Sequence, residues 1–198
     1  MERANIVVSS YAYSKRKRLF DLFLSFVLLL SLVILIPIIW VLMLLVDKGP
    51  LIFSQTRIGY EGKEFILIKI RSMRRGFECD SINQKEISRL GSLIRKLHID
   101  EFPQAFNIIK GEMSFVGPRP YVIEECESNS LKLERFHLRA LVKPGITGLA
   151  QIEYQHENIE QAARKLELDL HYISTCSLRM DAHILFSTFL DSVMGRGE

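Results

Sequence analysis

Residues 22–46 read LFLSFVLLLSLVILIPIIWVLMLLV, and this stretch contains no charged side chain. A helix needs about 20 apolar residues to cross the hydrocarbon core of a bilayer, so the stretch is long enough to do so. It is too long for the apolar core of a signal peptide, and no small-x-small cleavage site follows it. We therefore expect the segment to be retained and to hold the chain in a membrane.

Two features of this run argue against a simple crossing. Asp21 stands at its start and Pro37 lies inside it; proline removes one helical hydrogen bond and bends a helix. Both flanks are basic, with Lys15–Arg18 before the run and an excess of lysine and arginine over residues 48–75. Because basic flanks mark the cytoplasmic side, both ends favour that side. A kinked single span and a re-entrant helix, which bends near Pro37 and returns, both fit this composition.

The run divides the 198 residues into a basic N-terminal cytosolic segment (1–21), a membrane helix (22–46) and a cytosolic domain (47–198). The net charge of +3 is too small to favour nucleic acid as a partner. The three cysteines and five histidines lack metal-site spacing, so we expect reduced thiols and no zinc centre. The chain has no phosphate-binding P-loop, no dinucleotide fingerprint and no serine nucleophile elbow.

The cytosolic domain is predicted to be compact, mostly helical and of the α+β class. A short β-hairpin is expected, with strands at 51–55 and 64–70 around a glycine-bearing loop. Two stretches rich in proline or glycine, 116–120 and 143–148, are expected to be rigid loops. Helical patterns lie at 87–96, 103–110, 158–172 and 181–194.

The last of these helices places apolar residues at helical spacing. They are Ile184, Leu185, Phe189 and Val193. Such a stripe fits either a face of the core or an interfacial amphipathic helix that lies against lipid. It would also serve as a surface for a homodimer.

The stretch Arg95-Lys-Leu-His-Ile-Asp-Glu-Phe-Pro-Gln104 is the richest in groups able to do chemistry. Proline is tolerated in the first turn of a helix, so Pro103 predicts that a helix begins there. Asp100 and Glu101 would then lie near its positive end, which keeps a carboxylate ionised. An ionised carboxylate can attack phosphorus or bind a hard divalent cation. A structural role as a helix cap is the more common use of such an acid.

Several cations have the setting of phosphate ligands. Arg119 stands between two prolines, which fix its backbone, and its planar guanidinium can grip a phosphate in two places. Lys69 and Arg71 end a predicted strand and would meet a diphosphate or lipid headgroups. Lys143 opens the loop 143–148, whose glycines let backbone approach a ligand. Each of these residues also fits an ordinary surface position.

These stretches together resemble the bacterial sugar transferases, the small monotopic polyprenyl-phosphate sugar-1-phosphate transferases. The resemblance runs from about Lys15 to the C-terminus, with every motif in the family's order. The matching pieces are Lys17-Arg-Leu-Phe-Asp21, Phe53-Ser-Gln-Thr-Arg-Ile-Gly59, Phe65 with Lys69-Ile-Arg-Ser-Met73, Leu90-Gly-x-x-Ile-Arg95, Asp100-Glu-Phe-Pro-Gln104, Asn107–Pro120 and Pro144-Gly-Ile-Thr-Gly-Leu-Ala-Gln151.

The resemblance implies a mechanism and a place. Asp100 would attack the β-phosphate of a UDP-sugar, UMP would leave, and undecaprenyl (polyprenyl) phosphate would then accept the sugar phosphate from the enzyme. Glu101 would help to hold Mg²⁺, and Arg95 and Arg119 would lie near the phosphates. The apolar run would be a re-entrant helix broken at Pro37, with the catalytic domain on the cytoplasmic face of the bacterial inner membrane. The product would begin the assembly of an exopolysaccharide, capsule, O-antigen or glycoprotein.

Two departures from the family pattern leave alternatives open. Ile36 stands where the family often has a serine before the proline, and Ser31 is the nearest replacement hydroxyl. After Gln151 the family often continues with glycine and arginine, which are absent here; Arg164 is a candidate to supply the missing cation. One alternative is a membrane-anchored scaffold of the same fold with weak catalysis. Another is a single-span glycosyltransferase that releases UDP, which would need a larger nucleotide-binding domain.

Overall fold

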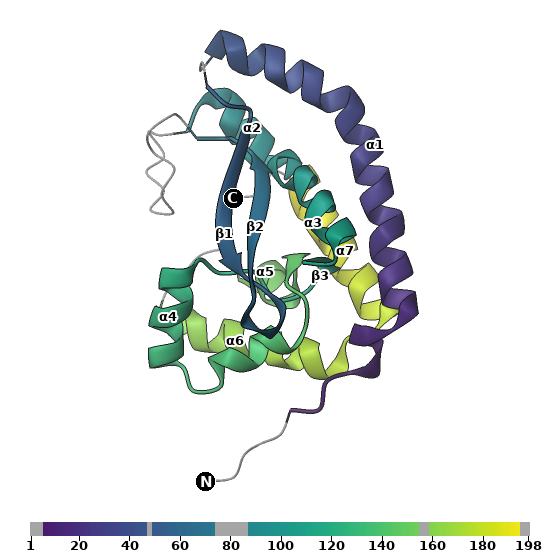
Figure 1. The fold of residues 1–198 in the computed structure, drawn as a ribbon, viewed down its shortest axis with the longest axis vertical. Coiled ribbons are helices and arrows are strands. Elements are labelled where there is room, and N and C mark those ends of the chain that lie inside the picture. The colour runs from purple at the N-terminus through teal and green to yellow at the C-terminus, as the bar shows by residue number, and fades with distance from the viewer. Residues whose placement is uncertain (1–5, 47–48, 74–86, 155–158, 195–198) are drawn as a thin grey trace.

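The computed structural model describes residues 6–46, 49–73, 87–154 and 159–194. The predicted mostly helical α+β class is confirmed, with a long apolar N-terminal helix and small sheets. Figure 1 shows α1 along one edge of the molecule, beside the elements that follow it. The helices are α1 (Lys15–Val46), α2 (Arg89–Lys96), α3 (Ala105–Lys110), α4 (Ile123–Lys132), α5 (Leu149–Glu153), α6 (Ile159–Thr175) and α7 (Leu178–Val193). Short 3₁₀ helices are η1 (Ser10–Tyr13), η2 (Tyr60–Gly62), η4 (Ile99–Gln104) and η5 (Phe136–Leu141), and the strands are β1 (Ile52–Ile58), β2 (Glu64–Ile70), β3 (Ser114–Val116) and β4 (Gly145–Thr147).

Helix α1 contains the predicted membrane segment. Among the described residues it is the one helix that is long and apolar enough to cross a membrane. It remains helical through Pro37 and is visibly bent along its length in Figure 1. Proline cannot donate to the carbonyl four residues earlier, here that of Val33. Ser31 does not replace this bond, because its hydroxyl donates to the Leu28 carbonyl instead, at 2.7 Å. Re-entry into one leaflet stays a prediction.

One face of α1 is buried against the domain and the others are exposed. The buried positions follow helical spacing: Lys17, Asp21, Ser25, Leu32, Ile39 and Met43. The exposed faces carry large apolar side chains, Phe23, Phe26, Trp40 and Leu45 among them. Exposed apolar surface of this extent marks a contact with lipid or with another protein. Helix α1 is therefore both an apolar surface helix and a wall of the domain core.

Buried polar groups fasten the start of α1 to the domain. The Lys17 Nζ donates to Asp181 Oδ2 of α7 at 2.7 Å, and Tyr172 Oη donates to Asp181 Oδ1 at 2.8 Å. Asp21 Oδ1 accepts hydrogen bonds from Ser114 Oγ and from the Phe115 backbone N–H, both at 3.0 Å. Because these groups are buried, each depends on its partners to offset the loss of water. Helix α1 is thus part of the folded domain rather than a flexible tether.

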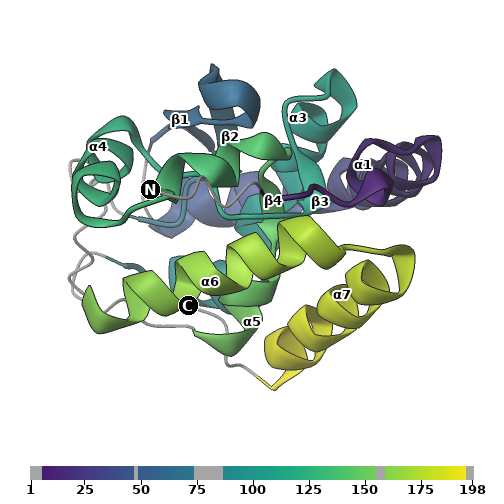
Figure 2. The same cartoon turned by 90° about the horizontal axis from the view of Figure 1, so that it is seen from below.

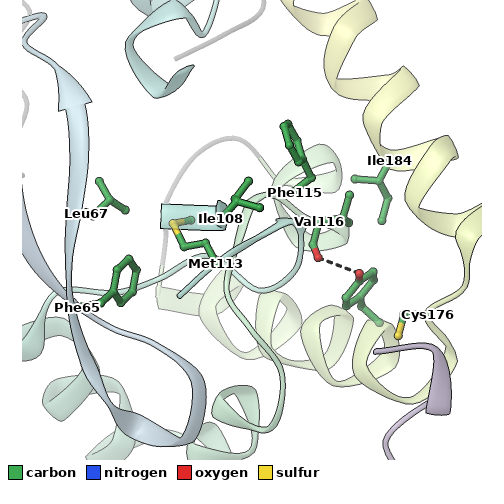
Figure 3. Packing of buried hydrophobic residues seen from close by; sticks show 9 residues of the cluster. Phe65, Leu67, Ile108, Met113, Phe115, Val116, Cys176 and Ile184 are labelled. Atoms are coloured by element: carbon green, nitrogen blue, oxygen red, sulfur yellow. Dashed lines mark hydrogen bonds between the residues drawn. The ribbon is translucent and has the colours of Figure 1, made fainter. Parts of the chain in front are cut away.

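The predicted hairpin is present, and its first strand is longer than expected. Strands β1 and β2 are antiparallel, with Ile52 opposite Ile70 and Ile58 opposite Glu64. The sequence suggested a loop from Arg57 onward, but Arg57 and Ile58 pair with β2 and the turn begins at Gly59. The alternation of side chains along β2 buries Phe65 and Leu67, which belong to the core cluster drawn in Figure 3.

The two stretches expected to be loops are joined to each other. Strands β3 and β4 are parallel, with Ser114 opposite Gly145 and Val116 opposite Thr147. The prediction that 143–148 is only a loop is therefore wrong for Gly145–Thr147. A Cβ atom on Gly145 would lie 2.1 Å from the backbone nitrogen of Gly117, so this pairing needs glycine. The contact holds the loop that carries Arg119 in a fixed place.

Helices α6 and α7 form a layer on one side of the molecule, with the hairpin and α3 on the other (Figure 2). The Tyr172 hydroxyl of α6 also lies 2.9 Å from the Val116 carbonyl of β3, the contact dashed in Figure 3, so its one proton is shared between this carbonyl and Asp181 Oδ1. The stripe on α7 is divided between its two predicted roles. Ile184 is fully buried in the core, whereas Phe189 and Val193 are 63% and 66% exposed.

Candidate active site

The acid pair lies in the first turn of the 3₁₀ helix η4. His98 before it adopts a left-handed conformation (φ 52°), which turns the chain out of α2 and into η4. The helix begins at Ile99, so the prediction of a start at Pro103 is wrong; Pro103 lies within η4. Helix α3 continues directly from it. Asp100 is 7% exposed and is held against the end of the hairpin, where Lys69 Nζ lies 3.8 Å from Glu101 Oε1.

A cavity of about 470 Å³ brings five of the predicted residues together. They are Asp100, Glu101, Lys69, Arg95 and Arg119. They come from four parts of the chain: η4, β2, the end of α2 and the loop after β3. Two carboxylates beside three cations form a site suited to anionic oxygen atoms, since lysine and arginine are the usual ligands of phosphate.

The electrostatics of this cavity favour an anionic ligand. Burial, reinforced by the charge of Glu101, raises the pKa of Asp100 from 3.8 to about 6, while Lys69 and Arg95 oppose the rise. Burial lowers the pKa of Lys69, and Glu101 opposes that change. The Nη1 atom of Arg95 is buried, and within the described part of the chain it has no hydrogen-bond partner. A phosphate oxygen would supply the acceptor that this donor lacks.

Two predicted phosphate ligands lie elsewhere. Arg71 is 3% exposed and its guanidinium packs against Gly49, where α1 gives way to the hairpin. Lys143 lines a separate cavity of about 360 Å³ together with Lys17, Arg18 and Asp21. The structure does not bring either residue into the cavity of the acid pair, and their roles as substrate ligands stay predictions.

The structure adds residues that the sequence patterns did not single out. Lys165 of α6 lines the cavity, whereas the suggested Arg164 is exposed and donates to the Tyr154 hydroxyl at 3.4 Å. The helical period could have indicated that Lys165 points inward, because it precedes the buried Asp169 by four residues and so lies on the same face of α6. Gln151 also lines the cavity, and its Nε2 donates to the Ile146 carbonyl at 3.1 Å.

The rest of the cavity is mainly apolar. Leu28 of α1 lines it, and so do Ile146, Ile152, Phe189 and Val193, with Thr188, Asp191 and Ser192 of α7 as polar neighbours. The acid pair therefore shares one cavity with a side chain of the apolar helix α1. Such a site can hold a ligand that is polar at one end and apolar at the other.

The carboxylates of the cavity fit Mg²⁺ only as a partial ligand set. No group of three or more His, Cys, Asp or Glu side chains is close enough together to hold a metal in the ranges that the structure describes. Mg²⁺ is commonly bound by one or two carboxylates, with substrate phosphates and water as the other ligands. Glu101 and Asp100 meet that requirement if a diphosphate is present.

Known proteins give this site a family. The model of the bacterial sugar transferase family matches residues 12–195. An undecaprenyl-phosphate glucose phosphotransferase of Komagataeibacter xylinus is 36% identical over 192 residues, which cover 91% of this chain and 36% of that protein. A second relative is the UDP-N-acetylgalactosamine-undecaprenyl-phosphate N-acetylgalactosaminephosphotransferase of Aeromonas hydrophila. It is 35% identical over 182 residues, which cover 85% of this chain and 43% of that protein.

The chain spans less than half the length of these two relatives, but nearly the whole of a third. The exopolysaccharide production protein PSS of Rhizobium leguminosarum bv. phaseoli is 35% identical over 195 residues, which cover 92% of this chain and 96% of that protein. The family match includes α1, the hairpin, the acid pair and α7 together. The chain therefore belongs to the bacterial sugar transferase family.

Proposed function

We propose that this protein transfers a sugar 1-phosphate from a UDP-sugar to undecaprenyl phosphate and releases UMP. The observation that carries the proposal is the single cavity in which Asp100 and Glu101 meet three cations beside Leu28 of the membrane helix. The reaction has one polar and one lipid substrate, and the cavity offers a wall for each. It would take place at the cytoplasmic face of the bacterial inner membrane and begin the assembly of a glycan.

Asp100 is the proposed nucleophile of the first step. One of its carboxylate oxygens forms a bond to the β-phosphorus of the UDP-sugar, and the bond from that phosphorus to the bridging oxygen breaks. UMP leaves with the bridging oxygen and its electron pair, and the sugar phosphate stays on Asp100. Only the ionised carboxylate can attack. With a pKa of about 6, Asp100 is mostly ionised at neutral pH.

The cations position and neutralise the phosphates. Phosphoryl transfer depends mainly on positioning and on stabilising charge. Arg119 is held by the loop pinned to β4, and Arg95 presents a buried donor without a partner among the described residues. Lys69 Nζ lies 3.8 Å from Glu101 Oε1 and lines the same cavity, where it would add positive charge beside the substrate phosphates. Lys165 lines the cavity from α6 and is the proposed replacement for the family's missing arginine after Gln151.

Glu101, with Asp100 before its attack, is the proposed protein ligand for Mg²⁺. When bound, Mg²⁺ supplies positive charge that neutralises the diphosphate and assists the departure of UMP. The carboxylate of Glu101 would hold the ion in the cavity, and Lys69 would orient that carboxylate.

The second step regenerates the enzyme. A phosphate oxygen of undecaprenyl phosphate forms a bond to the phosphorus held on Asp100, and the bond between that phosphorus and the Asp100 oxygen breaks. The product is a sugar linked to the lipid through a diphosphate. Because the nucleotide part of the donor has already left as UMP, the acceptor can enter the same cavity after the donor.

UMP release tests the proposal directly. The protein in nanodiscs would be incubated with Mg²⁺, undecaprenyl phosphate and a panel of UDP-sugars, with Asp100→Asn as the matched variant. We expect UMP from one or two donors, and none with Asp100→Asn. Without acceptor, the wild type should gain the mass of one sugar phosphate. Release of UDP would instead indicate simple glycosyl transfer, and no nucleotide from any donor would favour a scaffold.

A further inference from the structure

The cavity of about 470 Å³ has two walls of opposite chemistry. The acid pair and its cations form one, and the other is mainly apolar: it consists of side chains from α1, β4, α5 and α7, with Asp191 and Ser192 of α7 among its polar members. A UDP-sugar carries polar groups along its whole length and has no aliphatic part to cover the second wall. Undecaprenyl phosphate, the acceptor of the proposed function, has an aliphatic chain attached directly to its phosphate. The second wall therefore matches the acceptor and not the donor.

We propose that Leu28 of α1 and Phe189 and Val193 of α7 bind the first isoprene units of the acceptor. These three residues are called the lipid wall below. The inference rests on the proposed function and adds where on the protein the lipid chain lies. It separates the residues that recognise the acceptor from those that recognise the donor.

The position of Leu28 supports this assignment. It follows the buried Ser25 by three residues and precedes the buried Leu32 by four, so the helical period places it on the inward face of α1. At 1.5 Å per residue it lies about 10 Å further along the helix than Asp21, well inside the apolar run. The cavity thus reaches a part of α1 that would be surrounded by lipid, and a chain lying against Leu28 need not enter water.

Helix α7 supplies the outer part of the lipid wall. Leu185, Phe189 and Val193 follow one another at intervals of four residues and all line the cavity. Leu185 packs against the core, whereas Phe189 is 63% exposed and Val193 is 66% exposed. The stripe therefore leads from the protein core to the rim of the cavity. Apolar surface exposed at a rim is unfavourable in water and gains from being covered by an aliphatic chain.

Both walls belong to one cavity, which fixes the direction of the bound acceptor. With its chain on the lipid wall, the acceptor directs its phosphate toward Lys69, Arg95 and Arg119. This is where the attack on the phosphorus held by Asp100 takes place. Charge and apolar surface thus favour the same orientation.

Two phenylalanines on α7 give a matched experiment. Phe186 is 61% exposed, almost the same as Phe189, but does not line the cavity. Wild type, Phe189→Ser, Val193→Ser and Phe186→Ser would be compared in nanodiscs of one phospholipid composition. Two quantities are measured: the UMP released in one turnover without acceptor, and the KM for undecaprenyl phosphate.

We expect Phe189→Ser and Val193→Ser to raise the KM for the acceptor roughly ten-fold, as the loss of a partly buried apolar contact implies. Their single-turnover UMP release should match that of the wild type, and Phe186→Ser should change neither quantity. Phe189→Leu, which keeps an apolar side chain and guards against a folding defect, should stay close to the wild type.

Three results would overturn the inference. An equal rise in KM with Phe186→Ser would mean that α7 acts only by attaching to the membrane. A fall in single-turnover UMP release with Phe189→Ser would place that residue in the donor site. An unchanged KM in both lipid-wall variants would show that the chain lies elsewhere. A wild type that releases no UMP would instead reject the proposed function, and the inference with it.

Discussion

Replacing Asp100, the proposed nucleophile, should make this protein more stable while it abolishes the proposed reaction. Asp100 is 7% exposed and sits next to Glu101, so its ionised form is disfavoured in the folded state. Asp100→Asn keeps the shape of the side chain and removes the charge. The ionised carboxylate of Asp100 is thus expected to lower the stability of the folded protein.

The magnitude follows from the shift in pKa. A rise from 3.8 to about 6 corresponds to roughly 3 kcal/mol, at about 1.4 kcal/mol per pKa unit. A raised pKa means that the folded state binds the proton more tightly than the unfolded state does. The contribution of Asp100 is therefore most favourable below pH 4 and is lost as the pH rises through about 6. Asp100→Asn should match the wild type near pH 4 and exceed it by up to about 3 kcal/mol at pH 8.

Thermal unfolding measures this difference. Wild type and Asp100→Asn would be compared by far-ultraviolet circular dichroism in one detergent, at one heating rate, between pH 4 and pH 8. For a chain of this size the expected gain in Tm is roughly 5–10 °C at pH 8. Glu61→Gln is the control, because Glu61 is an exposed carboxylate of the hairpin turn and should leave Tm unchanged.

One outcome would refute the reasoning. If Asp100→Asn were no more stable than the wild type at pH 8, while Glu61→Gln also left Tm unchanged, burial and the charge of Glu101 could not be raising the pKa of Asp100. A gain of the same size at pH 4 and pH 8 would refute it as well, because that gain would not come from ionisation.

Three further predictions concern other parts of the molecule. The rate of UMP release in one turnover should rise with pH through about 6, as Asp100 loses its proton; a flat profile between pH 5 and pH 8 would contradict its role as nucleophile. Asp181→Ala should lower the free energy of unfolding by about 3–5 kcal/mol, because it leaves Lys17 buried without its 2.7 Å partner, whereas Tyr172→Phe should lower it by only about 1 kcal/mol. Equal melting temperatures for the two variants would contradict this expectation. Lys165→Met should raise the KM for the UDP-sugar roughly ten-fold, since Lys165 lines the cavity, and Arg164→Met should leave that KM unchanged. The reverse result would make Arg164 the residue that supplies the missing cation.

Local patterns predicted the elements whose cause is local. The apolar run predicted residues 22–46 of α1, although the helix begins earlier, at Lys15. The predicted second strand of the hairpin coincides with β2. The acid pair was found because two adjacent carboxylates stand among cations in a recognised motif. The burial of Asp100, which is only 7% exposed, and the raised pKa that follows from it could not be foreseen. That property depends on β2, α2 and the loop after β3 closing around η4.

Contacts between distant segments decided what the patterns missed. Gly145–Thr147 looked like part of a loop because its strand partner is at 114–116, outside any local window. Lys143 looked like a phosphate ligand because a glycine-bearing loop follows it, but its side chain lines a different cavity. Pro103 predicts a helix start, whereas η4 begins earlier, directly after the left-handed residue His98. Each miss depended on tertiary packing, which overrides local preference.

The buried link between Lys17 and Asp181 has a consequence for how the protein is made. Asp181 follows Lys17 by 164 residues. At about 5–20 residues per second, a ribosome needs roughly 8 to 30 seconds to add it. During that interval α1 is already synthesised and carries a lysine whose closest carboxylate partner, 2.7 Å away in the folded protein, does not yet exist; its other partner, Asp21 on the same helix, lies 3.9 Å away. A chain that stops short of α7 therefore lacks the closest partner of this buried charge, and we expect the start of α1 to be fastened to the domain only after α7 has been made.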